Sequence, residues 1–170
     1  VPAEARVFVR PHKNVFSHPN PYNLFIPAVY MGIAGAAINE AVRFAARYQP
    51  NSLDQPIGRL PTIRQAIGQM ELELSAARHF LYSVAEKFDQ GRYPSDEAWR
   101  PDFGAAKVFA VQSALNVVDK AMRIVGIHSL ALSHPLQRMY RDVRFGLHNP
   151  PMEDAVLQQL ADRAFGGTES

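Results

Sequence analysis

Cysteine is absent from all 170 residues, which excludes disulfide bonds, thiol catalysis and cysteine metal sites. A chain without cysteine suits a reducing compartment, and we therefore expect a cytoplasmic location. The excess of one sign of charge is also small, because 18 Lys and Arg residues against 16 Asp and Glu residues leave a net charge of only +2. No basic run alternates with aromatic residues, so we expect no nucleic-acid partner.

Several motifs are missing as well. The six histidines include no H-x3-H or HExxH pair, so we expect no metal site. The chain has no G-x-S-x-G nucleophile elbow, no P-loop and no G-x-G-x-x-G turn. The uncharged run Leu24–Ile38 is shorter than a bilayer span and contains Pro27, so we expect no membrane segment.

Hydrophobic residues make up 47% of the chain, enough for one well-packed domain. From Tyr22 onward the pattern predicts helices joined by polar, proline-marked loops. The predicted helices cover residues 22–48, 61–90, 103–125 and 135–147, followed by a short helix from Pro150-Pro151 to Gly166. Residues 49–60 and 91–102 are predicted loops.

The helix over residues 61–90 carries an apolar seam with alternating steps of four and three residues. The helix over 103–125 separates into an apolar face and a polar face that includes Ser113. We expect the polar face to meet solvent, and the alternative is that it lines a cofactor or subunit contact. These patterns predict an all-α fold, an antiparallel up-and-down four-helix bundle with a short fifth helix. The predicted core includes Ile67, Met70, Leu74, Leu81, Leu115, Val118 and Met122.

The first predicted helix is apolar on most sides. Ala28, Gly32 and Ala36 follow each other at spacing four and form a flat stripe, which suits a close helix contact within the fold or between subunits. Three other helices do not supply enough cover for such a helix. We therefore expect self-association, as a dimer or a tetramer.

Residues 1–21 differ from the rest. They hold four prolines around a single alternating run, Ala5–Arg10, and a lone strand cannot satisfy its own backbone. This segment either docks on the helices or is the end of a β-domain that lies upstream. The chain begins at Val1, which suggests a processed or excised product, and the second interpretation is the one that we favour. The predicted domain is thus 22–170.

The stretch Arg123–Arg144 is the most informative part of the chain. Gly126 is placed to end one helix and Pro135 to open the next. Three arginines then recur at every third residue, and Asp142 is spaced to pair with Arg138. Taken alone, this pattern describes a solvated, salt-bridged helix face.

The same stretch resembles the C-terminal helical domain of the acyl-CoA dehydrogenase family. That domain reads Q-x-H-G-G-x-G-Y, a short loop, then Pro and R-x-Y-R-D-x-R. The matching residues are Gly126, Pro135, Arg138, Tyr140, Arg141, Asp142 and Arg144. Ile127 replaces the second glycine, and Ser129-Leu130 replaces Gly-Tyr. Further similarity at Tyr30–Ala37, Gln65–Arg78 and Ala105–Lys107 extends the resemblance over residues 25–148 in the family order.

The resemblance implies the C-terminal domain of a flavoprotein oxidoreductase. Such a domain forms part of the FAD site wall and the subunit interface, and it contacts FAD only in the full-length oligomer. Arg123, Gly126 and Arg141 are the cofactor-binding residues that the resemblance implies, with acyl-CoA as substrate. The isolated domain is expected to be colourless and inactive.

Two departures resemble the flavin-dependent monooxygenase branch, which implies FAD or FMN and a small aromatic or organosulfur substrate. The family's R-x-x-F-G pattern is absent after Arg47, and the stretch where the family has a catalytic glutamate reads Gly146–Pro151. His148 in this stretch is the candidate catalytic residue, or it caps the arginine-rich helix. A helical assembly or protein-binding bundle without chemistry is the alternative from another class. A small-ligand sensor has no supporting motif.

Overall fold

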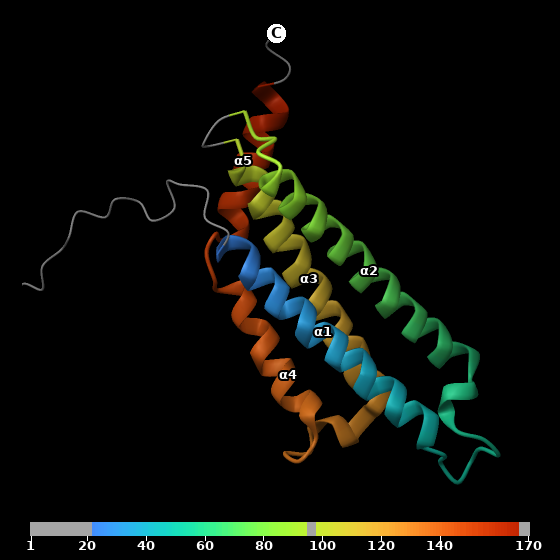
Figure 1. The fold of residues 1–170 in the computed structure, drawn as a ribbon. Helices are drawn as coiled ribbons and strands as arrows, with labels where there is room; N and C mark the ends of the chain where they lie inside the picture. Colours follow the sequence, from blue (N-terminus) through green and yellow to red (C-terminus); the bar gives the residue numbers. More distant parts are fainter. Residues whose placement is uncertain (1–21, 95–97, 167–170) are drawn as a thin grey trace, which may run out of the picture.

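The computed structural model describes residues 22–94 and 98–166, and this part of the chain is helical with no strand (Figure 1). The α-helices are α1 (Tyr22–Arg47), α2 (Pro61–Asp89), α3 (Arg100–Val125), α4 (Pro135–Arg144) and α5 (Glu153–Gly166). Short 3-10 helices are η2 (Ile57–Arg59), η3 (Gly126–Leu130) and η4 (Phe145–Leu147). The predicted fold class is confirmed. The predicted extended segment 1–21 lies outside the described residues.

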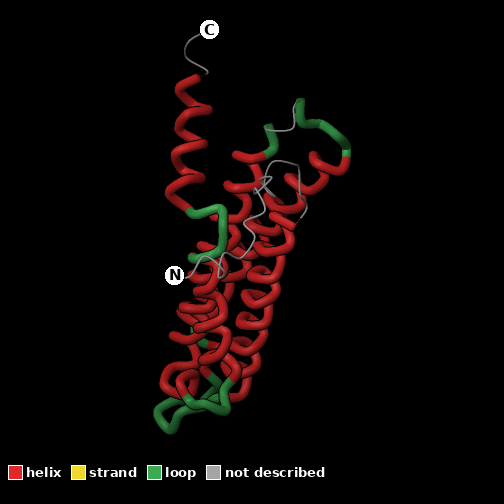
Figure 2. Tube along the Cα trace, turned by 90° about the vertical axis from the view of Figure 1, so that its left-hand side faces the viewer, coloured by secondary structure: helices red, strands yellow, loops and turns green. Residues whose placement is uncertain are grey.

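The helices alternate in direction along the chain. In Figure 1, α1 and α3 run the same way through the centre, while α2 and α4 run the opposite way on either side. Helix α1 contacts α2, α3 and α4, and α3 contacts all four other helices. Helix α5 continues past the end of the bundle (Figure 2). The two central helices therefore carry most of the core.

Local sequence signals set the helix ends. Gly91 and Gly126 have φ angles of 62° and 65°, in the region that glycine adopts without strain, and each lies just after the end of a helix. Pro135 opens α4, and His134 Nδ1 accepts a hydrogen bond from the Leu136 N–H at 3.2 Å. Helix α3 starts at Arg100, earlier than predicted, because Pro101 fits its first turn.

The predicted seam of α2 faces the core. Its fully buried members are Met70, Leu74, Ala77, Leu81 and Val84. The predicted exposure of the polar face of α3 is wrong in part, since Ser113 is only 6% exposed. On another side of α3, the Lys107 side chain is only 2% exposed, and burial lowers its pKa, an effect that Glu153 partly offsets. Four helices surround α3, so little of it remains for solvent.

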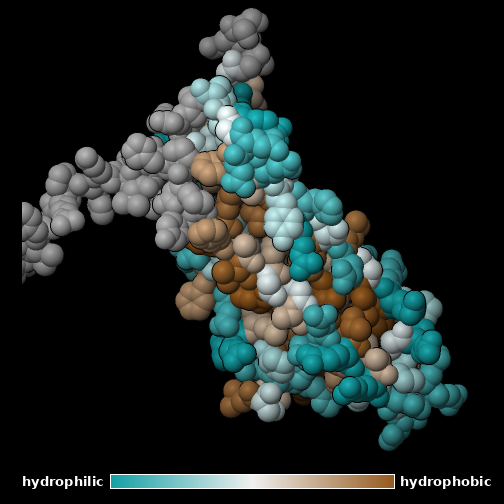
Figure 3. All heavy atoms as spheres, viewed as in Figure 1, coloured by the Kyte–Doolittle hydropathy of each residue, from teal (hydrophilic) through white to brown (hydrophobic). Residues whose placement is uncertain are grey.

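The small-residue stripe of α1 lies on the surface. Ala28 and Gly32 are exposed, and a Cβ added to Gly32 would meet no atom within 4 Å. The expected helix contact within this fold is therefore wrong at these residues, while a contact between subunits stays a prediction. Phe25 and Val29 are exposed on the same face of α1, and Figure 3 shows apolar residues along this helix.

By length and composition, the stretch Asn23–Arg47 of α1 could cross a membrane. The same stretch contacts α2, α3 and α4, and its buried residues include Ala34, Ala37 and Ala41. Its apolar composition thus has a sufficient explanation in the bundle core.

Asp102 joins three elements at the end of the bundle where α3 begins. Its carboxylate accepts hydrogen bonds from Lys87 Nζ at 2.8 Å, Arg163 Nη1 at 2.7 Å and the Tyr93 hydroxyl at 3.2 Å. Burial acts to raise the pKa of Asp102, but the bonds from Lys87 and Arg163 outweigh it and hold that pKa below its usual value. Burial and the nearby carboxylate raise the pKa of Tyr93. The cluster fastens α5 to α2 and α3.

Helix α5 has two more anchors on α3. A Cβ added to Gly104 would lie 2.8 Å from Val156 Cγ2, so the two helices approach closely there. Gln112 Nε2 donates to Glu153 Oε2 at 2.9 Å. Glu153 and Asp154 occupy the first turn of α5, as the sequence predicts, and Glu153 also binds across to α3.

Replacing Gly58 by alanine should lower the free energy of unfolding by roughly 1–3 kcal/mol, because its Cβ would lie close to backbone. That Cβ would be 2.8 Å from the Ala45 carbonyl oxygen on α1. Gly68→Ala is the matched control, since nothing lies within 4 Å of its Cβ in α2. It should raise stability by about 0.5–1 kcal/mol. Urea unfolding curves measure both, and equal shifts would contradict the packing of η2 on α1.

Candidate functional site

Two of the predicted cofactor-binding residues meet in one surface hollow. This hollow, of about 470 Å³, lies where α3, η3 and α4 meet. We call it the η3 hollow, and its lining consists of Asp119, Met122, Arg123, Leu130, Gln137, Tyr140 and Arg141. Arg123 and Arg141 come from different helices, so only the tertiary structure brings them together. Gly126 lies at the start of the same turn.

Arg144 is committed to structure. Its Nη2 atom bonds Asp119 Oδ1 at 3.1 Å, its Nη1 atom donates to the Tyr140 carbonyl at 2.8 Å, and its guanidinium lies 3.4 Å from the Tyr140 ring centre. The predicted pair between Arg138 and Asp142 is not formed. The ion pair that α4 forms thus joins Arg144 to Asp119 on α3, and the predicted local pair within α4 is absent.

Arg123 and Arg141 keep an uncompensated positive charge. Both are exposed, and neither forms an ion pair within the described ranges. Asp119 also lines the η3 hollow, but its carboxylate bonds Arg144. Two guanidinium groups beside apolar side chains such as Met122 suit an anionic diphosphate joined to a flat ring system. The donor set therefore fits the expected FAD.

The turn after α3 keeps its shape despite the replaced residues. Gly126 has φ 65° and ψ −145°, a conformation that side chains exclude. The buried Ser129 hydroxyl donates to the Gly126 carbonyl at 2.7 Å. Ile127 and Leu130 are 81% and 64% exposed on this turn. The turn thus presents an apolar surface beside the two arginines.

Sequence reasoning missed a second basic hollow. It has a volume of about 560 Å³ between α1, η2 and α2, and Arg59 and Arg64 lie on its wall with Val42 and Ile67. Neither arginine has an ion pair in the described ranges. The sequence did contain a signal for it. The pair Gly58-Arg59 lies between two prolines and interrupts the stretch that is predicted to be a continuous loop.

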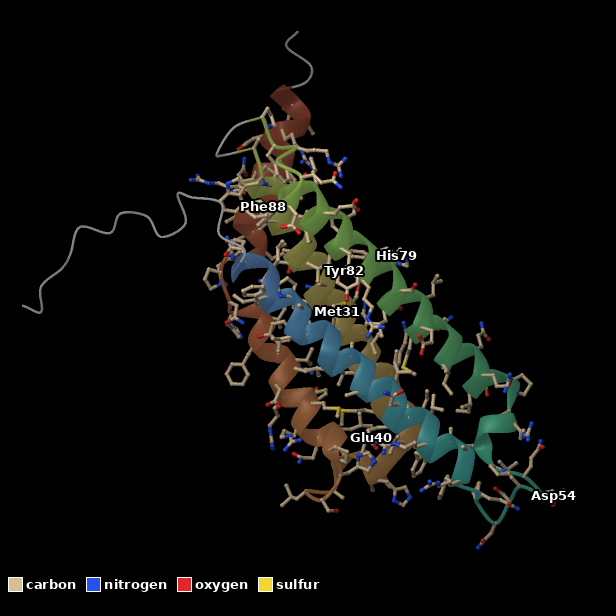
Figure 4. All side chains as sticks on the ribbon, in the orientation of Figure 1. Met31, Glu40, Asp54, His79, Tyr82 and Phe88 are labelled. Carbon is tan, nitrogen blue, oxygen red and sulfur yellow. The ribbon has the colours of Figure 1, made fainter. Side chains whose placement is uncertain are left out.

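A third hollow, of about 460 Å³, lies near the C-terminal end of α1, and its lining includes Arg43, Arg47 and His134. Glu40, labelled in Figure 4, also lines it and forms an ion pair with Arg43. The ring centres of Phe44 and Tyr48 are 4.7 Å apart. This end of the bundle thus combines arginines with aromatic rings.

His148 does not join the cofactor-binding residues. It follows η4 and does not line the η3 hollow, and α4, a helix roughly 15 Å long, precedes it. Its backbone N–H donates to the Phe145 carbonyl at 3.0 Å, while its imidazole is exposed and has no hydrogen bond within the described ranges. The backbone, and not the imidazole, therefore ends the helix.

The turn that carries His148 is held in place from α1 and α3. Asn149 Nδ2 donates to the Tyr30 hydroxyl at 2.7 Å, and burial raises the pKa of Tyr30 although this bond acts to lower it. A Cβ added to Gly146 would lie 2.9 Å from the Val111 methyl groups. The His148 imidazole is therefore exposed on a turn that contacts with α1 and α3 hold in place.

Comparison with known proteins identifies relatives. The family model described as "Acyl-CoA dehydrogenase, C-terminal domain" matches residues 24–149. The Bacillus subtilis protein YdbM, named as an acyl-CoA dehydrogenase, is 54% identical over 151 residues, which are 86% of this chain and 38% of that protein. The 3-(aryl)acrylate reductase of Clostridium sporogenes is 35% identical over 119 residues, which are 70% of this chain and 30% of that enzyme.

A solved structure shows the same fold. Butyryl-CoA dehydrogenase from Megasphaera elsdenii superposes with a TM-score of 0.72 at 24% identity, covering 80% of this chain and 34% of that chain. This chain therefore spans 30–38% of the length of the three proteins named. The similarity to the monooxygenase branch stays a prediction, since these relatives are named as dehydrogenases and a reductase.

Proposed function

Because this chain belongs to the acyl-CoA dehydrogenase family and matches its C-terminal domain, we propose that it is the C-terminal helical domain of a flavin-dependent oxidoreductase. In this proposal it forms part of the FAD site wall and part of the subunit interface. The observation that carries the proposal is the pair Arg123 and Arg141, uncompensated in the η3 hollow. We place the protein in the cytoplasm, in keeping with its lack of cysteine.

The residues of the η3 hollow bind and orient the cofactor in this proposal. Arg123 and Arg141 would hold the diphosphate of FAD, and the turn that begins at Gly126, three residues after Arg123, would let backbone approach it. Bound FAD would supply hydride transfer for an acyl-CoA substrate. The isolated domain lacks the remainder of the site and is not competent alone.

One substitution tests the cofactor assignment in the full-length protein. Arg141→Ala should raise the FAD dissociation constant about tenfold, since it removes one charged contact. Arg138→Ala is the matched control, because Arg138 is exposed on the same helix and does not line the η3 hollow. Flavin fluorescence titration measures both. An equal effect of the two variants would contradict the assignment.

We also propose self-association, as a dimer or a tetramer, through the exposed face of α1. Phe25 and Val29 are 56% and 61% exposed there. Such a face is costly to leave in water, and an interface buries it. Size-exclusion chromatography of the 170-residue chain, with light scattering and absorbance detection, should give an oligomer without flavin colour. A monomer at micromolar concentration, or stoichiometric flavin, would contradict these expectations.

A monooxygenase-type reaction, with FAD or FMN and a small aromatic or organosulfur substrate, is the second candidate function. The observation that favours it is the exposed imidazole of His148 on a fixed turn. The nearest following carboxylate, Glu153, bonds Gln112 instead. His148 moves a proton in this proposal. A full-length protein that binds no flavin and only assembles would favour the bundle without chemistry.

A further inference from the structure

A single side chain of α1, Tyr30, contacts the turn that carries His148 at two places. A Cβ added to Gly146 would lie 3.1 Å from Tyr30 Cε2, so the ring packs against the backbone that precedes His148. The Tyr30 hydroxyl accepts a hydrogen bond at 2.7 Å from Nδ2 of Asn149, the residue directly after His148. Tyr30 thus holds this turn on both sides of the histidine.

The backbone of this turn is packed closely against two helices. Gly146 is buried, and its added Cβ would also lie 2.9 Å from both Val111 methyl carbons on α3. The turn therefore fits between α3 and the Tyr30 ring of α1 at this point. The His148 imidazole itself is exposed and forms no hydrogen bond within the described ranges. Its location therefore depends on the backbone of the turn.

The bond from Asn149 to Tyr30 does not depend on pH near neutrality. Tyr30 is 6% exposed, and burial raises its pKa above the usual value of a tyrosine, although the bond from Asn149 acts to lower it. The hydroxyl therefore stays neutral over the pH range in which an imidazole titrates. The hold on the turn is thus the same whether His148 is charged or neutral.

We propose that Tyr30 is a positioning residue for His148. It acts through Asn149 and Gly146 and holds the imidazole at one place beside the reacting atoms. This inference rests on the proposed proton transfer by His148. Proton transfer needs the two heavy atoms within about 3 Å of each other, and a misplacement of about 1 Å lowers the rate by about 100-fold. A turn that is free to move therefore loses rate even when His148 is present.

Tyr30→Phe tests the proposal in the full-length protein, because it keeps the ring against Gly146 and removes only the oxygen that accepts from Asn149. We expect kcat to fall about tenfold and KM to change less than about twofold, since the turn places the imidazole and does not bind the substrate. Asn149→Leu should give a similar loss. The double variant should lose little more than either single variant, because both substitutions remove the same bond.

Backbone ¹⁵N relaxation of the 170-residue chain tests the same hold without any turnover. The amide groups of His148 and Asn149 should have order parameters of about 0.85, as in rigid backbone, and Tyr30→Phe should lower them toward about 0.6. Tyr82→Phe is the matched control, since Tyr82, labelled in Figure 4, is 65% exposed on α2. It should change neither kcat nor the order parameters. All rates are measured below the thermal midpoint of every variant.

The two measurements separate the positioning role of Tyr30 from the proton transfer itself. The positioning role is overturned if Tyr30→Phe keeps the kcat of the unmodified protein or keeps order parameters near about 0.85. It is also overturned if the losses in Tyr30→Phe and Asn149→Leu are additive in the double variant. In these cases His148→Phe still loses turnover, so the proton transfer stands. Unchanged turnover in His148→Phe instead contradicts the proton transfer, and the positioning role with it.

Discussion

Replacing His148 by phenylalanine in the full-length protein should lower turnover about 100-fold or more, with little change in thermal stability. The imidazole is exposed and has no hydrogen bond among the residues described, so its removal breaks no contact. Asn149 and Gly146 hold the turn independently of it. A large loss of rate without a loss of fold is therefore the signature of a proton-transfer role.

His79→Phe is the control for this experiment. His79 is also exposed, and its Nδ1 atom lies 2.9 Å from the Ser75 carbonyl oxygen on α2. It should leave both turnover and thermal midpoint unchanged. Unchanged turnover in His148→Phe, or a loss fully explained by unfolding, would remove the catalytic role and leave a residue that only follows the helix end.

Phe103→Ala should lower the free energy of unfolding by about 3–5 kcal/mol, the largest effect on stability that we expect. Phe103 is 1% exposed, and its ring packs against Phe88, Tyr93 and Trp99 at centre distances of 5.5, 6.2 and 4.8 Å. The cavity left behind would loosen the start of α3, where Asp102 also fastens α5.

Phe109→Ala is the matched control on the same helix. Phe109 is 45% exposed and has one described aromatic partner, Phe80, at 5.9 Å. Its removal should cost about 1 kcal/mol. Urea unfolding followed by circular dichroism measures both variants. Equal destabilisation would show that the aromatic cluster around Phe103 is not the core of this end.

The amino-acid sequence by itself determined the helices and much of the core. The seam of α2 is a local repeat, so Met70 and Leu74 were predicted to be buried before any partner helix was known. The ends at Gly91 and Gly126 follow from the freedom of glycine at positive φ. The resemblance also identified the family from the segment around Arg141. In each case the cause acts within a few residues of the chain.

Only the tertiary structure decided which side chains meet. A local rule pairs Arg138 with Asp142, yet the bond that forms joins Arg144 to Asp119 of α3. Ser113 was predicted to be exposed, but α3 is surrounded by four helices, which its own sequence does not reveal. The close approach of Val156 to Gly104 likewise depends on where α5 lies against α3. Burial and long-range contacts depend on the packing of distant segments, and no local pattern encodes that packing.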